Sequence, residues 1–240
     1  KKIARGRGVK LARPVCLALS VVVVLGILFA AAFMMLPSLR QSGEELIAKA
    51  YGRHDLRKTG SGNTGTTNVL RTLGWLPSIL TLVGDAAKGT LAALIGRALG
   101  GETGMLVAGL FAVLGHDFPA HAKFRGGKGM ATSLGVTIII CPPVAPFLVL
   151  IVVVAVAITH TMSIGSLIAS IAYPFLTLAF MPENATRWMY IVFAILLMLL
   201  GLVCHRGNVS RLLKGRENVL DFKKIKTLSQ KYDLFHKKKK

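Results

Sequence analysis

The chain has 240 residues, of which 53% are hydrophobic, and its 30 Lys and Arg against 10 Asp and Glu give a formal net charge of +20 at pH 7. The mean hydropathy of +0.60 is too high for an ordinary soluble domain, and the composition also excludes a disordered chain, a collagen and a disulfide scaffold. A charged side chain costs roughly 2.5–3.5 kcal/mol at the centre of a bilayer. We therefore predict a membrane protein in which apolar spans alternate with basic loops.

The first elements along the chain are a basic stretch, residues 1–14, and an apolar stretch at about 15–36. The apolar stretch resembles a signal peptide, but it is long and lacks an obvious small-residue cleavage site, so we predict a spanning helix. Cys16, Cys141 and Cys204 lie within or beside apolar runs, and none has a second Cys or a His at metal-ligand spacing. We expect small core residues there, and neither a metal nor a cofactor.

Six further apolar segments follow, at about 74–97, 103–118, 130–141, 143–159, 163–181 and 188–204. Between 130 and 159, Pro142-Pro143 removes backbone donors, so a hairpin of two short helices competes with one kinked helix. We predict an all-α integral membrane protein with seven transmembrane helices, some of them short.

The distribution of Lys and Arg selects the two sides of the membrane. With seven spans, the loop 49–71, the loop near residue 125 and the tail after Cys204 share one side, whereas the opposite loops hold only Arg97 and Arg187. The positive-inside rule makes the first side cytoplasmic, although the basic N-terminal stretch then lies outside. A six-span count would put the more basic C-terminal tail outside. The predicted parts are a basic N-terminal tail (1–14), a seven-helix membrane domain (15–220) and a basic C-terminal tail (221–240).

The first basic loop contains a glycine- and hydroxyl-rich stretch from Gly60 to Arg71. Closely spaced glycines let backbone N–H groups approach an anion, and the arginine adds a planar guanidinium. The stretch lacks the Gly-Lys-Ser/Thr ending of a P-loop, and no strand precedes it as in a dinucleotide site. Either a flexible loop or a phosphate cradle fits this composition.

A second glycine-rich stretch, Gly126-Gly127-Lys128-Gly129, precedes a predicted helix whose N-terminal N–H groups favour negative charge. After the last span, His205 and Asn208 share a helix face at i, i+3, and Ser163 and Ser166 have the same spacing. Membrane-anchoring cations and helix-capping hydroxyls would give similar patterns. Two such loops on one face favour an anion site.

Asp85 and Lys88 lie three residues apart within the second span. Because an unsatisfied charge is costly in hydrocarbon, we predict a structural ion pair inside the bundle. The alternative is that the pair positions the neighbouring anion-binding loop. His116 is predicted to be structural, at the end of the third span.

Three ordered motifs extend these patterns over about residues 40–220. They are Gly60-Ser61-Gly62-Asn63…Gly65…Thr67-Asn68-Val69-Leu70-Arg71, then Gly115-His116…Phe118-Pro119 with Phe124…Gly126-Gly127-Lys128-Gly129…Ala131-Thr132-Ser133, and His205-Arg206…Asn208…Arg211-Leu212-Leu213…Gly215…Glu217-Asn218. Together they resemble the bacterial acyl-phosphate:glycerol-3-phosphate acyltransferases, the PlsY family. The polar segment 40–47, Thr66 and His160-Thr161 depart from the family's usual residues.

The resemblance implies a multi-pass enzyme of the bacterial inner membrane with its active-site loops on the cytoplasmic face. It implies transfer of a fatty acyl group from acyl phosphate to the sn-1 hydroxyl of glycerol 3-phosphate, which gives lysophosphatidic acid and phosphate in phospholipid synthesis. The expected partners are these two substrates and membrane lipid, without nucleic acid, and the expected state is a monomer. The rival classes are a transporter or channel for an anionic solute, and a structural lipid-binding protein.

An acyl phosphate carries a good leaving group, so no acyl-enzyme is required, and the sequence has no Gly-x-Ser-x-Gly elbow. Orientation and charge stabilisation can supply most of the rate. The predicted catalytic residues are Ser61, Lys128, His205 and Asn208. The predicted phosphate-binding residues are Arg71, Lys128, Gly62, Asn63, Gly65, Thr67, Asn68, Gly126, Gly127, Ser163 and Ser166. The proton acceptor is either His205 or the substrate's own phosphate.

Overall fold

The computed structural model describes residues 56–119, 124, 126–184 and 186–231, and within them every regular element is helical. The all-α prediction is confirmed for this part of the chain. The predicted first span at 15–36 and the basic residues before it lie outside it. The elements are η1 (Leu56–Lys58), α3 (Thr66–Leu73), α4 (Trp75–Asp117), α5 (Met130–Ile140), α6 (Val144–Thr159), α7 (Met162–Phe180), α8 (Arg187–Cys204), α9 (Arg206–Leu213) and α10 (Phe222–Lys231).

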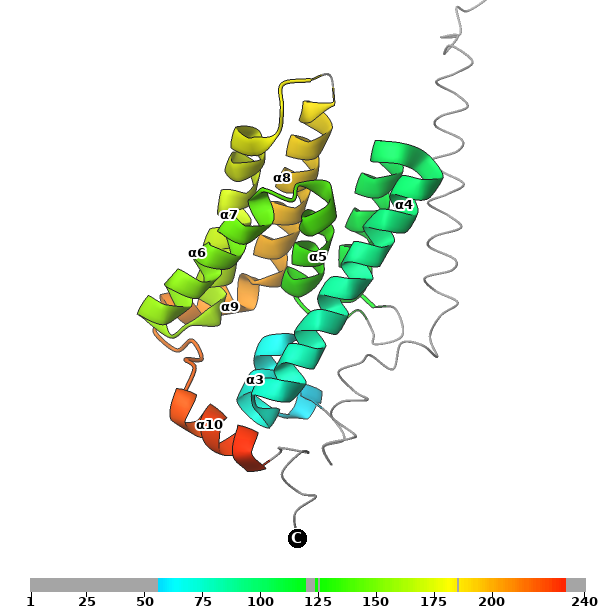
Figure 1. The fold of residues 1–240 in the computed structure, drawn as a ribbon. Coiled ribbons are helices and arrows are strands. Elements are labelled where there is room, and N and C mark those ends of the chain that lie inside the picture. Colours follow the sequence, from blue (N-terminus) through cyan, green and yellow to red (C-terminus); the bar gives the residue numbers. More distant parts are fainter. Residues whose placement is uncertain (1–55, 120–123, 125, 185, 232–240) are drawn as a thin grey trace, which may run out of the picture.

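The helix α4 contains both predicted segments 74–97 and 103–118. Its two arms meet at Gly100 and Gly101, whose backbone leaves the helical region, and Gly101 has a φ of 61° that favours glycine. The chain reverses at this point (Figure 1). The arms approach so closely at Gly96 and Gly104 that neither position has room for a Cβ atom.

The prolines at 142 and 143 form a turn between α5 and α6, which confirms the hairpin over the single kinked helix. By length and composition, α4, α7 and α8 are apolar enough to cross a membrane, and α5 and α6 are shorter apolar helices. The helix α5 packs against α4, α6 and α8 (Figure 1), and its Val136 and Ile140 join the buried cluster around Tyr173 and Phe193.

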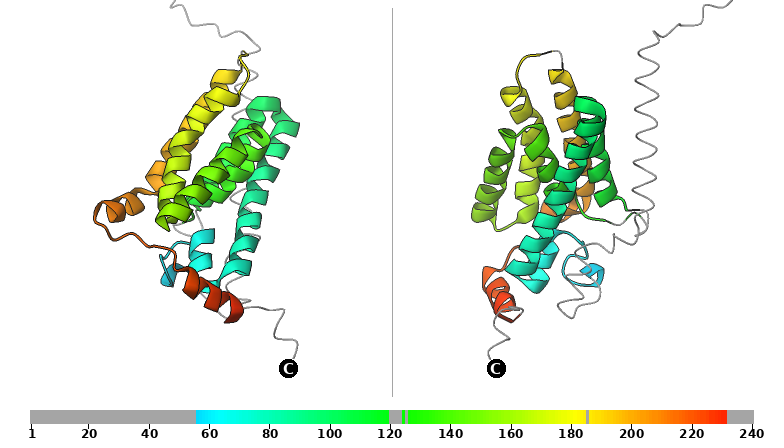
Figure 2. Two further views of the ribbon diagram at one scale, coloured as in Figure 1. Left: turned by 60° about the vertical axis from the view of Figure 1, so that its left-hand side comes forward. Right: turned by 45° about the vertical axis from the view of Figure 1, so that its right-hand side comes forward.

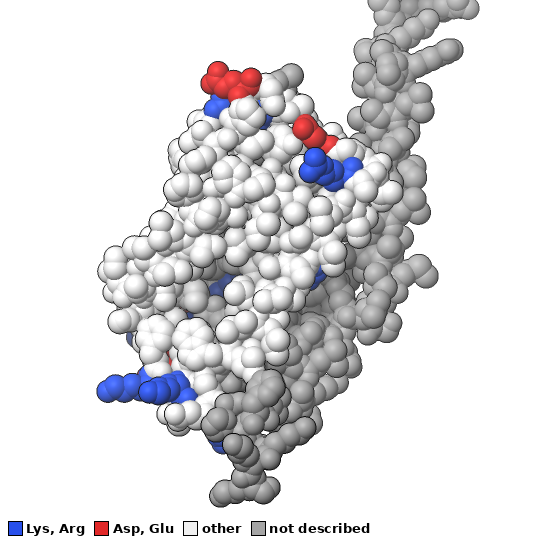
Figure 3. Space-filling view, in the orientation of Figure 1, with Lys and Arg blue, Asp and Glu red and all other residues white. Residues whose placement is uncertain are grey.

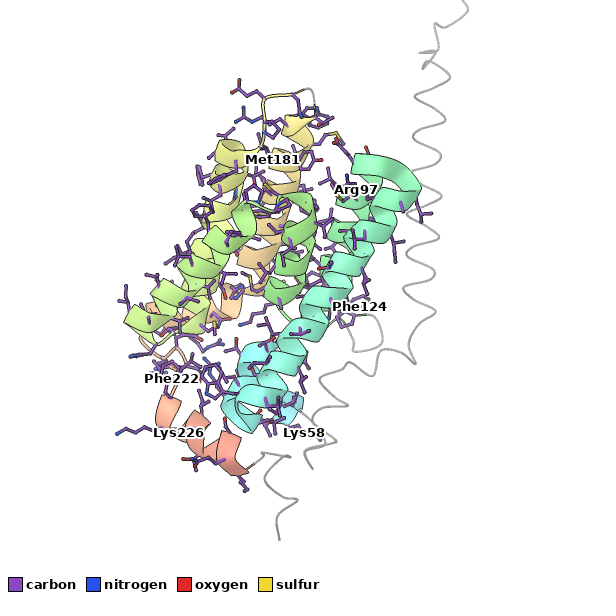
Figure 4. The ribbon with its side chains drawn as sticks, in the orientation of Figure 1. Lys58, Arg97, Phe124, Met181, Phe222 and Lys226 are labelled. Carbon is purple, nitrogen blue, oxygen red and sulfur yellow. The ribbon has the colours of Figure 1, made fainter. Side chains whose placement is uncertain are left out.

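The outer faces of these helices are apolar and exposed, as at Val83, Leu99, Ile158 and Phe175. An exposed apolar surface of this extent is typical of contact with lipid. In the view of Figure 3, the charged side chains gather mainly at the two ends, and an almost uncharged belt lies between them. Arg97 and Met181 lie at one end of this belt, and Lys58, Phe222 and Lys226 lie at the other (Figure 4).

The end of the bundle that carries Lys58 is crossed by residues 217–231, which we call the C-terminal strap. Its helix α10 lies beside α3 (Figures 1 and 2). Ile225 is 2% exposed and packs with Leu70 and Leu220. The Leu220 N–H donates to the His160 carbonyl (2.7 Å), and the Trp75 N–H donates to Ser229 Oγ (3.0 Å).

The prediction of a basic tail from residue 221 omitted α10. Lysines dominate the composition of this segment, and its few buried apolar residues give only a weak sequence signal. The helix begins at Phe222, directly after Asp221, whose carboxylate accepts the Lys224 N–H (3.0 Å) and whose carbonyl accepts the Ile225 N–H (3.0 Å). Residues 232–240 lie outside the described part of the chain.

Candidate active site

A cavity of about 360 Å³ lies where α3 and α4 meet α5–α9. Its polar walls come from the first loop, α3, α4, the start of α5, the start of α7 and the chain after α8. Its apolar walls come mainly from α5, α6, α7 and α8, for example Leu134, Val152, Ala169 and Leu197. The predicted site residues that line it are Ser61, Asn63, Gly65, Thr67, Asn68, Arg71, Lys128, Ser163, Ser166, His205 and Asn208.

Asn68 holds the first loop in shape. It is 1% exposed, its Nδ2 donates to the carbonyls of Leu56 and Thr59 (3.0 Å each), and its Oδ1 accepts the Ser61 N–H (2.8 Å). The side-chain amide thus has three protein partners. Asn68 positions Ser61 against the cavity.

Two of the glycine amides in this loop also have protein partners. The Gly62 N–H donates to the Thr59 carbonyl (3.1 Å), and the Gly65 N–H donates to Asn63 Oδ1 (2.8 Å). Gly62 does not line the cavity. These glycines therefore shape the loop rather than present free donors, whereas the Thr66 hydroxyl, which does line the cavity, is buried without a hydrogen-bond partner.

The second glycine-rich loop is fastened to the end of α4. The Gly126 N–H donates to the Asp117 carbonyl (3.1 Å), and the Gly127 N–H donates to the His116 carbonyl (3.1 Å). Neither glycine lines the cavity, but Lys128 directly after them does. The sequence predicts phosphate binding by Gly126 and Gly127, but in the structure their N–H groups fasten the loop that places Lys128.

The Asp85–Lys88 ion pair is confirmed, with Lys88 Nζ 2.5 Å from Asp85 Oδ1, but the Lys88 side chain is 43% exposed and so is not enclosed by the bundle as predicted. Lys88 Nζ also lies 2.6 Å from His116 Nδ1, which accepts because an ammonium only donates. Since the His116 backbone holds Gly127, the pair also supports the second loop. A structural ion pair and a role in positioning a neighbouring loop are therefore compatible interpretations of Asp85 and Lys88.

A chain of hydrogen bonds links Lys128 to the segment after α9. Lys128 Nζ donates to Asn208 Oδ1, and Asn208 Nδ2 donates to Glu217 Oε1 (2.8 Å). Glu217 Oε2 accepts from Arg211 Nε (2.9 Å). The ammonium group is therefore oriented by side chains far from it in the sequence.

Arg71 reaches the same cavity from α3. Its Nη2 donates to the Asn218 carbonyl (2.9 Å), while its Nε is buried without a partner. The Ser163 hydroxyl is likewise buried without a partner. Buried donors are normally satisfied, so these atoms indicate a place for an acceptor-rich ligand.

Burial changes the proton affinities of these cations. It lowers the pKa of Lys128 to about 8, an effect increased by Arg211 and Arg71 and opposed by Glu217. Burial also lowers the pKa of Arg71. Burial acts to raise the pKa of Glu217, but its hydrogen bonds from Arg211 and Asn208 outweigh this and lower it. Crowded, desolvated cations would be stabilised by an incoming anion.

His205 is 2% exposed, and its Nδ1 lies 2.8 Å from the Gly201 carbonyl. A carbonyl only accepts, so Nδ1 carries the hydrogen and Nε2 is the acceptor nitrogen of a neutral ring. Burial and the neighbouring Lys128 lower the pKa of His205 to about 4, against the opposing effects of Gly201 and Glu217. The pKa of His205 therefore lies below the ordinary histidine value near neutral pH that would favour it as a base.

Several cavity residues were missed as site residues from the sequence. Glu217 is one of them, although it is the only acidic residue between Arg206 and Leu220, a signal that could have singled it out. Asp85, His116 and Asp117 also line the cavity. Among the described side chains, no group of three or more His, Cys, Asp and Glu residues could hold a metal ion.

The helical bundle, its apolar belt and a cation-lined cavity at one end define a membrane protein with a site for anionic ligands. The sequence profile of the family described as "Glycerol-3-phosphate acyltransferase" matches residues 42–215. The chain belongs to this family of multi-pass integral membrane enzymes.

Individual relatives agree with this assignment. A glycerol-3-phosphate acyltransferase of Thermoanaerobacter pseudethanolicus is 39% identical over 73% of this chain and 86% of its own length. That of Desulforudis audaxviator is 43% identical over 75% of this chain and 88% of its own length. A crystal structure of PlsY, an integral membrane glycerol 3-phosphate acyltransferase, in its glycerol 3-phosphate form has a TM-score of 0.67 and 37% identity, covering 85% of this chain and 96% of that one.

Proposed function

We propose that the protein transfers a fatty acyl group from acyl phosphate to the sn-1 hydroxyl of glycerol 3-phosphate, with release of inorganic phosphate. One observation carries this proposal: desolvated Arg71 and Lys128 meet an apolar groove in a single cavity. The cations suit the phosphate groups of both substrates, and the groove suits a hydrocarbon tail. A related PlsY structure in its lysophosphatidic acid form, with 34% identity and a TM-score of 0.68, supports a ligand that combines a phosphate group with a hydrocarbon tail.

In the proposed reaction, the sn-1 oxygen attacks the acyl carbonyl carbon, the bond from that carbon to the phosphate oxygen breaks, and phosphate leaves with the electron pair. Arg71 and Lys128 offset the negative charge on the two phosphates, which otherwise repel one another. Ser61, Thr67, Ser163 and Ser166 supply hydroxyl donors around them. Asn63, Asn68, Gly62, Gly65, Gly126 and Gly127 keep the two loops in place.

The proton of the attacking hydroxyl is best accepted by the substrate's own phosphate. A histidine with a pKa of about 4 is a weak base at neutral pH. His205 Nε2 can still orient the glycerol 3-phosphate by accepting a hydrogen bond. Asn208 orients Lys128.

The variant His205→Gln tests this assignment. We expect a reduced but measurable rate and an unchanged pH profile from pH 5 to 8, because wild-type His205 is already neutral throughout this range. The measurement is the pH dependence of kcat in both proteins. Loss of a titration step between pH 5 and 8 in the variant would make His205 the base.

Lys128 should produce a pH dependence of its own. Because its pKa is about 8 in the free protein, its cation is present below pH 8 and is lost as the pH rises above 8. We expect kcat/KM for glycerol 3-phosphate to fall above pH 8, and Lys128→Arg, which stays protonated, to move this decline to higher pH. A decline at the same pH in wild type and variant would assign it to another group.

We further propose seven spans, with the site on the cytoplasmic side of the bacterial inner membrane. The separation of Arg97 from Lys58 and Lys226 supports this orientation (Figure 4). A tag at each terminus, read with a membrane-impermeant label, is expected to place the two ends on opposite sides. Both ends on one side would contradict seven spans.

The decisive assay uses purified protein in detergent with acyl phosphate and glycerol 3-phosphate. We expect stoichiometric formation of lysophosphatidic acid and phosphate, and no such product when glycerol 3-phosphate is omitted. A transporter or a structural lipid-binding protein would release no phosphate. Absence of product from folded protein would defeat the enzyme assignment.

A further inference from the structure

Asp117, the last residue of α4, has an unusual environment. It is 3% exposed and lines the cavity. Its Oδ2 accepts a hydrogen bond from the Cys204 thiol (3.3 Å), but its Oδ1 is buried without any partner. A buried carboxylate oxygen without a donor costs free energy, so its retention beside a cavity indicates a donor on the ligand.

The other acidic residues of the cavity do not share this feature. Asp85 binds Lys88, and Glu217 uses both carboxylate oxygens, one for Asn208 and one for Arg211. Asp117 is therefore the acidic residue of the described cavity that keeps a buried oxygen free of hydrogen bonds. In its carboxylate form Oδ1 only accepts hydrogen bonds, so it fits a hydroxyl of the ligand better than an ionised phosphate.

Asp117 lies on the α4 wall, whereas Arg71 extends from α3 and Lys128 precedes α5. One wall of the cavity thus carries a carboxylate that repels phosphate, and two other parts of its lining carry cations that attract it. Such a distribution orients a small molecule that has a phosphate at one end and hydroxyls elsewhere.

Glycerol 3-phosphate is such a molecule. Under the proposed function, on which this inference rests, its phosphate meets the cations and its sn-1 hydroxyl meets the acyl carbon. The sn-2 hydroxyl is then the polar group of the substrate that meets neither the cations nor the acyl carbon. We propose that Asp117 is a specificity-determining residue whose Oδ1 accepts a hydrogen bond from this sn-2 hydroxyl.

The test compares glycerol 3-phosphate with 3-hydroxypropyl phosphate, which keeps the phosphate and the reacting hydroxyl and lacks the middle one. We expect wild-type protein to prefer glycerol 3-phosphate by roughly 10- to 100-fold in kcat/KM, the range for a hydrogen bond to a charged group. Asp117→Ala should lose this preference by losing activity on glycerol 3-phosphate alone. Asp117→Asn, which retains an acceptor oxygen, should keep part of it.

Thr132→Val is the matched control, because Thr132 Oγ1 is also buried without a partner but its side chain does not line the cavity. It should keep the wild-type preference. An unchanged preference in Asp117→Ala, or an equal loss on both substrates in both Asp117 variants, would overturn the proposal.

Wild-type protein that turns over neither substrate would count against the proposed reaction instead. In that case calorimetry measures the affinity of wild type and of Asp117→Asn for glycerol 3-phosphate and for 3-hydroxypropyl phosphate. Tighter binding of glycerol 3-phosphate to wild type, with a smaller difference in the variant, supports the role of Asp117. Equal affinities of wild type for the two ligands refute it. If Asp117→Ala does not fold, the kcat/KM values of Asp117→Asn on the two substrates and its calorimetric affinities for them test the role of Asp117.

Discussion

Lys128→Ala is expected to lose almost all turnover, by roughly 10²- to 10³-fold or more in kcat, the usual cost of removing one preorganised charge-stabilising donor. Lys128 is partly desolvated, and Asn208 and Glu217 fix its orientation. No other described side chain can replace it from the second loop. Phosphate release, measured at saturating concentrations of both substrates, reports this change.

The fold should survive this substitution, because it removes a desolvated cation rather than a packed apolar group. Thermal unfolding in detergent is the control measurement, and Lys214→Ala is the control variant, since Lys214 is exposed and outside the cavity. A wild-type rate in Lys128→Ala would exclude Lys128 from the site.

Arg71→Ala should have an effect of similar size, seen in kcat/KM for glycerol 3-phosphate. Its Nε is an unsatisfied donor at the cavity, and its Nη2 is held by the Asn218 carbonyl, so the guanidinium is already oriented for a phosphate. Arg71→Lys should remain strongly impaired because an ammonium cannot reproduce the planar fork.

The matched control is Arg206→Ala, since Arg206 is exposed and does not line the cavity. Loss of the Asn218 contact should lower the free energy of unfolding of Arg71→Ala by only about 0.5–1.5 kcal/mol, so lost activity will not reflect lost structure. If Arg71→Lys turned over at the wild-type rate, only the charge of this residue would matter.

The sequence was sufficient to predict the helices of the apolar bundle, α4 to α8. Long apolar runs define the described spans, and two adjacent prolines or two adjacent glycines mark the sharp reversals within 130–159 and within α4. The ion pair of Asp85 and Lys88 was also predictable, because residues three apart on a helix lie side by side. All these features depend on local patterns.

The organisation of the site was less predictable because it depends on distant contacts. The spacing of glycines suggested free backbone donors, but the structure gives Gly62, Gly65, Gly126 and Gly127 protein acceptors. Likewise, the pairing of Asp117 with Cys204 joins positions 87 residues apart. Periodicity and composition do not contain this information.

The C-terminal strap also affects the order in which the site forms. Asn218 follows Arg71 by 147 residues, which at roughly 5–20 residues per second corresponds to a delay of about 7–30 s during synthesis. Until residues 217 and 218 are made, the arginine lacks the Asn218 carbonyl, and Asn208, which orients Lys128, lacks Glu217. The apolar helices can therefore enter the membrane while these cations are still in contact with water, and the cations are enclosed only when the end of the chain arrives.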